Sequence, residues 1–408
     1  MTSGAKLMSF VFLRLHRVCA ILIVLAAAGC SSFPRTPFTA NQQAIAQIPG
    51  IPGARIWADA AAESFAGVIH LEQMQSAARK SGSMDLLAIS GGASDGAFGA
   101  GVLTGLSEIG QRPEFVFVSG VSAGALIAPL VFLGPRYDQK LTYAWTSGIA
   151  APLGDGGVLS ILFSQDSRRL ALYELVSSFV DEAMLKEIAA EHQRGRRLVV
   201  VTTNLDAQRP VVWDLGAIAS SGHPKALQLF RDVLTASASI PGAFAPTLIE
   251  VEADGRQFTE LHVDGGATTQ LFTIPESILS KGLPNERLAK AMPTRFFIIV
   301  NNRLKPEFEV VEGSVVPMLA RSLSSLIKTH ARLTLVATRE FARSRNMQFN
   351  LAYIGDDFRS DLKPSFETVY MRAVYAYGRE KATSGTVWQN QLPFINGPPM
   401  VATAAPRR

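Results

Sequence analysis

The chain has 408 residues, of which 48% are hydrophobic and 18% are charged, and this balance excludes a disordered protein. Its formal net charge is +5, but Lys6, Arg14 and Arg17 lie in an N-terminal segment without acidic residues, and without these three cations the charge is +2. Because the sequence has no basic stripe with interleaved aromatic residues, we do not expect nucleic-acid binding.

The first 29 residues have the pattern of a secretory signal peptide. A positively charged start that ends near Arg17 is followed by an apolar run from Val18 to Ala28. This run is about half as long as the roughly 20 apolar residues that a membrane-spanning helix needs. We therefore predict that residues 1–29 are a signal and not an element of the fold.

The signal pattern ends in Ala27-Ala28-Gly29-Cys30. This ending resembles the lipobox of bacterial lipoproteins, which implies that the Cys30 thiol carries a diacylglycerol. Ser31 is similar to the sorting signal for the outer membrane of Gram-negative bacteria. The resemblance implies a lipid-anchored protein of the cell envelope that faces the periplasm. An ordinary cleaved signal and a retained N-terminal anchor are the alternatives.

The rest of the chain is expected to form one domain between two loose ends. Residues 30–54 are polar and aperiodic, which predicts a tether, and residues 396–408 are predicted to be a loose tail. With Cys19 in the signal, Cys30 is the one other cysteine, so no disulfide is expected in the mature domain of residues 55–395.

Short apolar runs alternate with longer helical patterns inside this domain, which favours an α/β fold with a largely parallel sheet covered by helices on both faces. Asp254-Gly255 predicts a tight hairpin turn within Ile249–Val263. The runs predicted as buried strands are Leu86–Ile89, Phe115–Val118, Leu198–Thr202, Val211–Trp213 and Phe296–Val300.

The first segment with a chemical pattern is Leu86–Gly101, where an apolar strand runs into a glycine-rich turn and then a helical pattern. Unhindered backbone N–H groups in such a turn form an anion-binding nest. A nucleotide phosphate is a poor fit, because no Lys-Ser/Thr pair follows Gly96 and GxGxxG does not occur in frame. An oxyanion hole fits better, and glycines that serve only close helix packing are the alternative.

The second segment is Phe115–Leu126, which contains Gly120-Val121-Ser122-Ala123-Gly124 between an apolar strand and a helical pattern. This is the context that a nucleophile elbow requires, with small residues flanking a serine on a strained turn. The pattern predicts that Ser122 is a nucleophile. A tight turn without chemistry is the alternative.

The third segment is Phe258–Gly266, where a strand ends in Asp264-Gly265-Gly266. The two glycines let the chain turn sharply and leave room for another loop to approach the carboxylate. Asp155, in Asp155-Gly156-Gly157, is a rival, but no strand precedes it and a surface turn is predicted there. Asp264 is therefore the preferred acidic residue.

In this order, the glycine-rich loop, GxSxG and DGG resemble the patatin-like phospholipase family. Three further segments are similar to that family or its lipoprotein branch, namely Arg55–Asp59, Leu234–Phe244 and Met371–Gly378. The resemblance implies a three-layer α/β/α patatin-like fold, and an acyl hydrolase that acts on membrane lipid or another acyl ester.

The same resemblance implies roles for individual residues. Ser122 and Asp264 would form a catalytic dyad, and the amides of Gly91, Gly92 and Ala93 would hold the oxyanion, with no cofactor and no metal. The loop departs from the family pattern at two positions, because Ala93 replaces the third glycine and Asp95 replaces a cation. The loss of that cation leaves a preference for anionic head groups open.

Two other functions stay open at this point. One is an α/β-hydrolase with a Ser-His-Asp triad, for which His330 is the one histidine after Asp264, on a helical pattern. His262 lies two residues before Asp264 on the same predicted strand, where a packing role is favoured. The other is a lipid-binding lipoprotein without turnover. The apolar stretch Val158–Phe163 is either a lid or the start of a buried helix.

Overall fold

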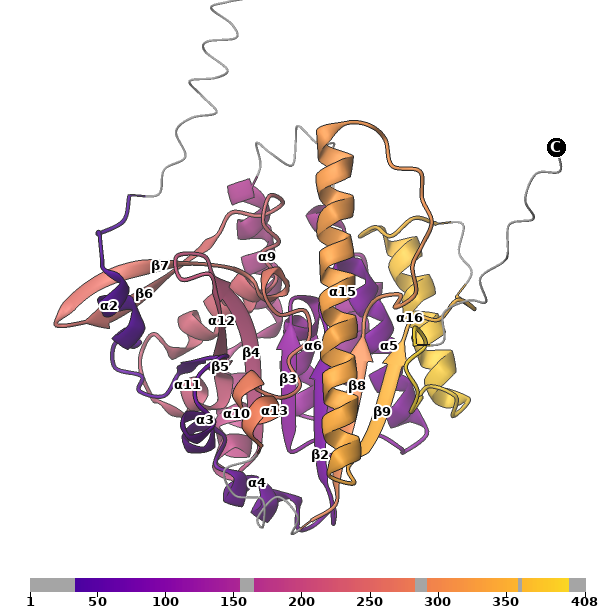
Figure 1. Ribbon diagram of the computed structural model, residues 1–408, viewed down its shortest axis with the longest axis horizontal. Helices are drawn as coiled ribbons and strands as arrows, with labels where there is room; N and C mark the ends of the chain where they lie inside the picture. Colours follow the sequence, from indigo (N-terminus) through magenta and orange to yellow (C-terminus); the bar gives the residue numbers. More distant parts are fainter. Residues whose placement is uncertain (1–33, 155–164, 283–291, 359–361, 396–408) are drawn as a thin grey trace, which may run out of the picture. The chain divides into compact units, whose positions relative to one another are not determined.

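The computed structural model describes residues 34–154, 165–282, 292–358 and 362–395 (Figure 1). The chain divides into two compact units, Met1–Thr39 and Ala40–Arg408. In the first unit, the described residues 34–39 form no helix or strand. The second unit holds the sheet and the helices. None of the described helices is both long and apolar enough to cross a membrane.

Within the described residues, nine strands join in one sheet, with the order β1-β5-β4-β3-β2-β8-β9 and with β6 and β7 paired beside β4. The five strands from β4 through β3, β2 and β8 to β9 run parallel. β5 is antiparallel to both β4 and β1, and β7 is antiparallel to both β4 and β6. The strands are β1 (Arg55–Trp57), β2 (Met84–Ile89), β3 (Phe117–Val121), β4 (Arg197–Asn204), β5 (Arg209–Asp214), β6 (Thr247–Ala253), β7 (Arg256–Asp264), β8 (Thr294–Val300) and β9 (Gln348–Tyr353).

Helices cover both faces of the parallel strands (Figure 1). On one face, buried apolar residues of β3 and β4 pack with Phe65 of α3, Ile278 of α13 and Phe341 of α15. The helices are α2 (Ala40–Ile45), α3 (Ala62–Ile69), α4 (Leu71–Ala78), α5 (Gly96–Glu108), α6 (Ala123–Phe132), α7 (Asp138–Thr146), α9 (Gln165–Phe179), α10 (Glu182–Gln193), α11 (Leu215–Ser220), α12 (Ala226–Ser237), α13 (Glu276–Lys281), α15 (Val315–Ser344) and α16 (Thr368–Thr383). The predicted α/β class with a largely parallel, doubly covered sheet is confirmed.

The central strands form where the sequence is apolar and branched, because both of their sides are buried. All residues of β3 and β4 are buried. The predicted strand Phe115–Val118 is displaced toward the serine, since β3 begins at Phe117 and continues through Gly120 to Val121. The polar appearance of Ser119 and Gly120 concealed this continuation.

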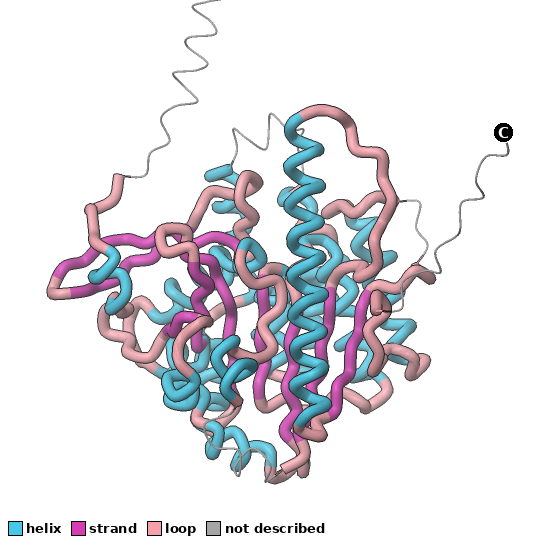
Figure 2. Tube along the Cα trace, in the orientation of Figure 1, coloured by secondary structure: helices cyan, strands magenta, loops and turns pink. Residues whose placement is uncertain are grey.

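The predicted hairpin is confirmed by β6 and β7 (Figure 2). Asp254 and Gly255 both have positive φ, 52° and 68°, which is the geometry of a type I′ turn. Buried and exposed residues alternate along β6, as expected of a strand with one solvated face.

The packed part of the chain begins earlier than the sequence predicts. Residues 40–54 were expected to belong to the tether, but they contain α2, and Gln47 exchanges two backbone hydrogen bonds with Glu252 of β6. Ile48 and Ile51 are buried. The sequence predicts a tether at residues 40–54 because the apolar residues there are too few and too widely spaced to show a helical or strand period.

Candidate active site

Ser122 stands at the turn between β3 and α6. Its φ and ψ of 54° and −123° lie in a region that residues with a side chain rarely occupy. The Ser122 N–H donates to Ser237 Oγ at 3.0 Å, and that hydroxyl donates to the Val201 carbonyl at 2.7 Å. The strained turn is therefore held by α12 and β4.

The two glycines that flank Ser122 leave no room for a side chain. A Cβ atom on Gly120 would lie 2.4 Å from the Gly124 carbonyl oxygen, and one on Gly124 would lie 2.2 Å from the Ile89 carbonyl oxygen. Both contacts are with backbone atoms, which cannot move away alone. The GxSxG spacing is thus required by the close approach of β3, α6 and β2.

Asp264 lies at the end of β7, opposite Thr202 of β4. Ser122 Oγ donates to Asp264 Oδ2 at 2.6 Å, and the Gly266 N–H donates to Oδ1 at 2.7 Å. The Asp264 N–H donates to the Ser239 carbonyl at 2.9 Å, which anchors the strand end. The structure thus joins two residues that are 142 positions apart in the sequence.

The electrostatic environment of Asp264 favours its protonated form. The residue is 4% exposed. Burial raises the pKa of Asp264 to about 7, although the hydrogen bonds from Ser122 and Gly266 act in the opposite direction. A carboxylate with a pKa near 7 accepts a proton from a hydroxyl more readily than one with an ordinary pKa.

The glycine-rich loop after β2 lies beside Ser122, but its three predicted amides differ. The Gly91 N–H donates to the Gln270 carbonyl at 3.2 Å, so this amide is engaged. Gly92 and Ala93 line the same cavity as Ser122, and among the described residues no group accepts from their N–H groups. The N–H groups of Gly92 and Ala93 can therefore donate to an anion in the cavity.

Two side-chain amides and one backbone carbonyl that the sequence does not single out hold this loop. Asn301 Nδ2 donates to the Ser90 carbonyl and Asn302 Nδ2 donates to the Gly91 carbonyl, at 2.9 and 3.2 Å. Gln270 supplies the carbonyl that engages Gly91. The signal for the asparagines was their place directly after Phe296–Val300, since parallel strands bring their carboxyl ends to one edge.

Asp95, which replaces the expected cation, does not line the cavity. The Tyr370 hydroxyl of α16 donates to Asp95 Oδ1 at 2.5 Å. Burial raises the pKa of Asp95 to about 6. This carboxyl group ties the start of α5 to α16, so its charge is directed away from Ser122.

Ser122 and Asp264 lie in a cavity of about 360 Å³ at the carboxyl edge of the parallel strands. Besides Asp264, its charged lining residues are Arg303 and Lys328. Arg303 donates to the carbonyls of Gly355 and Phe358, and Lys328 forms an ion pair with Glu307. The remaining lining residues are Gly92, Ala93, Ile240, Pro241, Gly266, Ala267, Gln270, Val300, Asn302, Leu304, Leu323, Ser324, Ile327 and Ala331.

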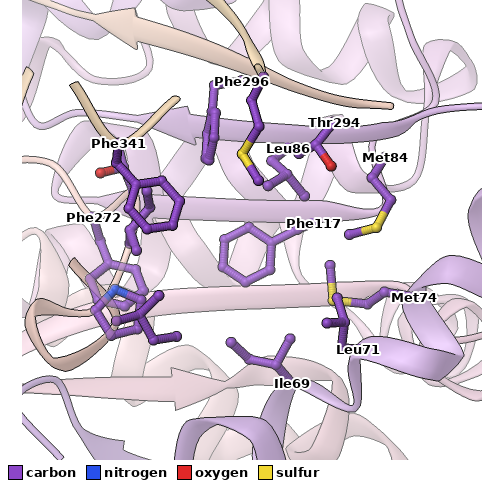
Figure 3. A pocket seen from close by; sticks show the side chains of 15 residues that line it. Ile69, Leu71, Met74, Met84, Leu86, Phe117, Phe272, Thr294, Phe296 and Phe341 are labelled. Atoms are coloured by element: carbon purple, nitrogen blue, oxygen red, sulfur yellow. The ribbon is translucent and has the colours of Figure 1, made fainter. Parts of the chain in front are cut away.

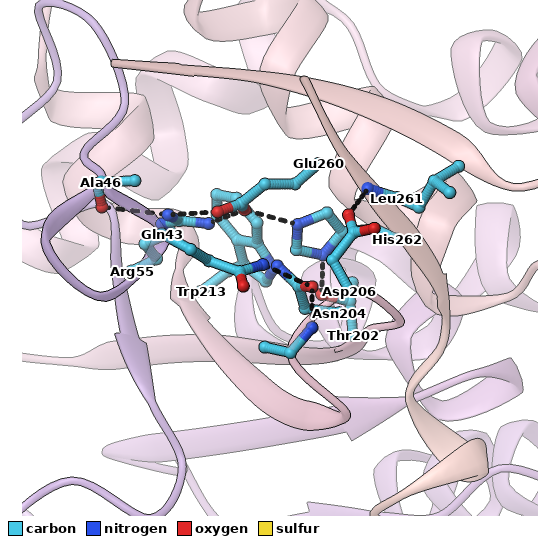
Figure 4. A network of polar contacts seen from close by, with 11 residues as sticks. Gln43, Ala46, Arg55, Thr202, Asn204, Asp206, Trp213, Glu260, Leu261 and His262 are labelled. Carbon is cyan, nitrogen blue, oxygen red and sulfur yellow. Dashed lines mark hydrogen bonds and ion pairs between the residues drawn. The ribbon is translucent and has the colours of Figure 1, made fainter. Parts of the chain in front are cut away.

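His262 belongs to a buried polar network and not to this cavity (Figure 4). Although burial opposes ionisation, hydrogen bonds from His262 and Arg55 hold the pKa of Glu260 at about 2. Glu260 is therefore an acceptor for His262 Nε2–H at 3.1 Å, and His262 Nδ1 accepts from the Thr202 hydroxyl at 2.9 Å. Trp213 Nε1 donates to the same Thr202 oxygen.

No histidine of the described ranges is hydrogen-bonded to Ser122 or Asp264. Both ring nitrogens of His262 are engaged in the network. His330 is exposed on α15 and does not line the cavity. The packing role predicted for His262 agrees with its contacts.

A second cavity, of about 110 Å³, lies on the face of the sheet covered by α3, α4, α13 and α15 (Figure 3). Its lining is apolar apart from Thr273 and Thr294. Met74, Met84, Phe117 and Phe296 are among the side chains that enclose it. Without an acid, a base or a nucleophile in its lining, this cavity offers no chemistry comparable to that around Ser122.

Several predicted features lie outside the described residues, namely Cys30, Asp155 and the stretch Val158–Phe163. In the ranges that are described, no cluster of three or more histidine, cysteine, aspartate or glutamate side chains could hold a metal ion.

In comparisons with known proteins, one family model matches part of the chain. The family model described as "Patatin-like phospholipase" matches residues 87–274, a span that includes Ser122 and Asp264. No curated protein matches the chain. Among solved structures, VipD from Legionella pneumophila is similar at 13% sequence identity with a TM-score of 0.34, covering 74% of this chain and 67% of that protein's chain.

Proposed function

We propose that this chain, which carries a patatin-like phospholipase domain at residues 87–274, is a serine acyl-ester hydrolase that acts on lipids. The observation that carries the proposal is the 2.6 Å hydrogen bond from Ser122 Oγ to Asp264 Oδ2 inside a cavity. The amides of Gly92 and Ala93, for which the described residues offer no acceptor, line that same cavity. A nucleophile, a base and anion-binding donors therefore meet at one place.

In the first half of the reaction, Asp264 Oδ2 takes the hydroxyl proton of Ser122 as Oγ attacks the ester carbonyl. The carbonyl oxygen becomes an oxyanion and accepts from the N–H groups of Gly92 and Ala93, each of which contributes about 2.7–4 kcal/mol in comparable sites. The positive end of α6 lies behind Ser122 and favours the same charge. Asp264 then returns the proton to the departing alcohol, which leaves an acyl-enzyme.

In the second half, a water molecule replaces the alcohol. Asp264 accepts a proton from the water, the resulting hydroxide attacks the acyl carbon, and the fatty acid leaves as Ser122 Oγ regains its proton. The same carboxylate thus serves both steps. Because burial raises the pKa of Asp264 to about 7, it can accept and release a proton near neutral pH.

The cavity suits an acyl ester. Ile240, Val300, Leu304, Ile327 and Ala331 contribute apolar walls, and the polar groups gather around Ser122. Ligand sites of this kind are mostly apolar with a few well-placed polar groups. No observation favours the triad or the lipid-binding protein without turnover as a second candidate.

The proposal is tested by labelling the full chain with a fluorophosphonate probe. The parent should be labelled and should release fatty acid from phospholipid vesicles, whereas Ser122→Ala should do neither. Ser324→Ala is the matched control, since Ser324 lines the same cavity from α15. Labelling that survives in Ser122→Ala, or that is lost in Ser324→Ala, would contradict the assignment.

We further propose that acylation of Cys30 attaches the protein to the envelope, with the outer membrane as its site. The support is the sequence ending Ala27-Ala28-Gly29-Cys30. In cell fractionation, Cys30→Ser should leave the membrane pellet and keep its hydrolytic activity on a soluble ester. A mutant that still pellets like the parent would rule out this anchor.

A further inference from the structure

The first half of α15 and the loop before it carry a concentration of exposed apolar side chains. Of the sixteen large hydrophobic residues that are exposed in the described ranges, seven lie within residues 308–326. Single exposed apolar residues are normal on a protein surface, but a cluster of this kind indicates an interaction site. The members of this α15 apolar surface are Phe308, Val310, Val315, Met318, Leu319, Leu323 and Leu326.

Two ion pairs fasten the loop before α15 to the helix. Glu307 pairs with Lys328 at 2.8 Å and Glu309 pairs with Arg321 at 3.2 Å. Phe308 and Val310, which alternate with these two glutamates in the sequence, are 95% and 81% exposed. The ion pairs therefore hold the loop beside the helix while these two apolar side chains remain exposed.

This surface is continuous with the cavity that holds Ser122. Leu323 is exposed and also lines the cavity, and Ser324, Ile327 and Lys328 of the same helix line it too. Figure 1 shows the first half of α15 extending beyond the carboxyl ends of β8 and β9, which is the edge where the cavity lies. A lipid that contacts α15 would thus lie next to the cavity mouth.

The charges of the helix suit a lipid surface. From Val315 through Arg339 the sequence has four basic residues and no acidic one, and two of the four, Arg321 and Lys328, are paired with glutamates of the preceding loop. A helix with leucine on one side and lysine or arginine on the other is typical of helices that lie at a bilayer interface. The cavity of about 360 Å³ suits a ligand of drug size.

We propose that the α15 apolar surface docks on a phospholipid bilayer, so that the cavity mouth faces the membrane and an acyl ester passes from the bilayer to Ser122. This inference rests on the proposed hydrolase function for its biological meaning. Docking itself is a binding event and can be measured without turnover. The partner is the lipid bilayer, and a second copy of this chain is the competing occupant.

The first test places a tryptophan on the helix in the full chain with Ser122→Ala, which leaves the vesicles intact. Leu319→Trp lies in the proposed surface, and Leu333→Trp is the matched control, because both leucines are 65% exposed. The two positions are 14 residues apart, about 21 Å along the helix. Vesicles of phosphatidylcholine and phosphatidylglycerol with brominated acyl chains serve as the probe.

After subtraction of the parent emission, the vesicles should quench Leu319→Trp by at least about half, because that side chain enters the acyl region. The Leu333→Trp emission should be unchanged. Equal quenching at both positions, or none at position 319, would overturn the proposal. Anchoring through another part of the chain would not reproduce the difference between the two positions.

The second test compares two substrates in the otherwise unchanged full chain. The double variant Leu319→Glu/Leu326→Glu should hydrolyse vesicle phospholipid at least about tenfold more slowly than the parent, because two apolar contacts become charges. Hydrolysis of a short-chain soluble ester should stay within about twofold, since neither residue lines the cavity. Leu333→Glu is the matched control and should retain both activities.

The outcomes separate this proposal from the proposed function. A parent that hydrolyses neither substrate would refute the hydrolase and leave the quenching result standing. Equal losses on both substrates in the double variant would refute docking. A parent that is dimeric by light scattering and a double variant that is monomeric would assign the surface to a second copy, which also refutes it.

Discussion

Replacing Asp264 by asparagine should change activity and stability in different ways. The substitution keeps the shape of the side chain but removes the group that accepts the Ser122 proton, so hydrolysis should fall by roughly a hundredfold or more. It also removes a carboxylate whose ionisation is opposed by burial. Because the free-energy cost of that ionisation depends on pH, the pH dependence of the free energy of unfolding tests the assignment more directly than the rate of hydrolysis does.

The magnitude follows from the pKa of Asp264, about 7 against an ordinary value of 3.8. Three units at about 1.4 kcal/mol each amount to about 4 kcal/mol. Because the folded pKa is raised, the stabilisation by protonation is full below pH 3.8 and is lost as the pH rises through 7. Asparagine does not titrate, and its single acceptor oxygen loses one of two hydrogen bonds, which costs about 1–3 kcal/mol at every pH.

Urea unfolding followed by circular dichroism at pH 5 and pH 8 tests this reasoning. The free energy of unfolding of Asp264→Asn, relative to the parent, should rise by roughly 2–3 kcal/mol between these two pH values. In parallel, kcat/KM of the parent should increase with pH through an apparent pKa near 7. A stability difference that is the same at both pH values would refute the claim that Asp264 is a buried carboxyl group with a raised pKa.

Two further pairs of variants test the loop and the histidines. Gly92→Ala should lower turnover by about a hundredfold, because its Cβ would lie 2.2 Å from the Asn301 carbonyl oxygen and would displace the Gly92 amide. Ala93→Gly keeps the backbone amide and relieves a φ of 49°, so its activity in the same ester assay should stay near that of the parent. His262→Ala should cost about 2–4 kcal/mol in urea unfolding, with most turnover per folded molecule retained, since it breaks two buried hydrogen bonds of a residue that does not line the Ser122 cavity. His330 is exposed on α15, so His330→Ala should change the free energy of unfolding and the turnover only slightly. A loss of turnover at either histidine as large as that of Ser122→Ala would favour a triad.

The α/β class could be predicted because the central strands are buried on both sides, so their sequences are continuous apolar runs. Val199, Val200 and Val201 in β4 are an example. The start of the packed unit at Ala40 could not be predicted in the same way. Residues 40–54 contribute a short helix and one bridge to Glu252, and so short a contact leaves no periodic signal.

The resemblance to the patatin-like phospholipase family implies that Ser122 and Asp264 form a pair, but the hydrogen bond between them required the structure. The state of the glycine loop could not be foreseen. Gly91, Gly92 and Ala93 look equivalent in sequence, but only the structure shows that the Gln270 carbonyl engages Gly91. A backbone hydrogen bond to a residue 179 positions away has no signature in either segment.

The features that oppose folding gather at one edge of the sheet. Ser122 has a strained backbone, Asp264 is a buried carboxyl group, and the amides of Gly92 and Ala93 have no acceptor in the part of the chain that the structure describes. Each of these costs on the order of one to a few kilocalories per mole. Such costs persist only where the surroundings hold the chain in place. Here β3 is buried on both faces, α12 holds the Ser122 amide, and Asn301 and Asn302 hold the loop. The concentration of these costs beside Ser122 is thus a physical reason to look for chemistry at this edge and not at the apolar cavity that α3, α4, α13 and α15 cover.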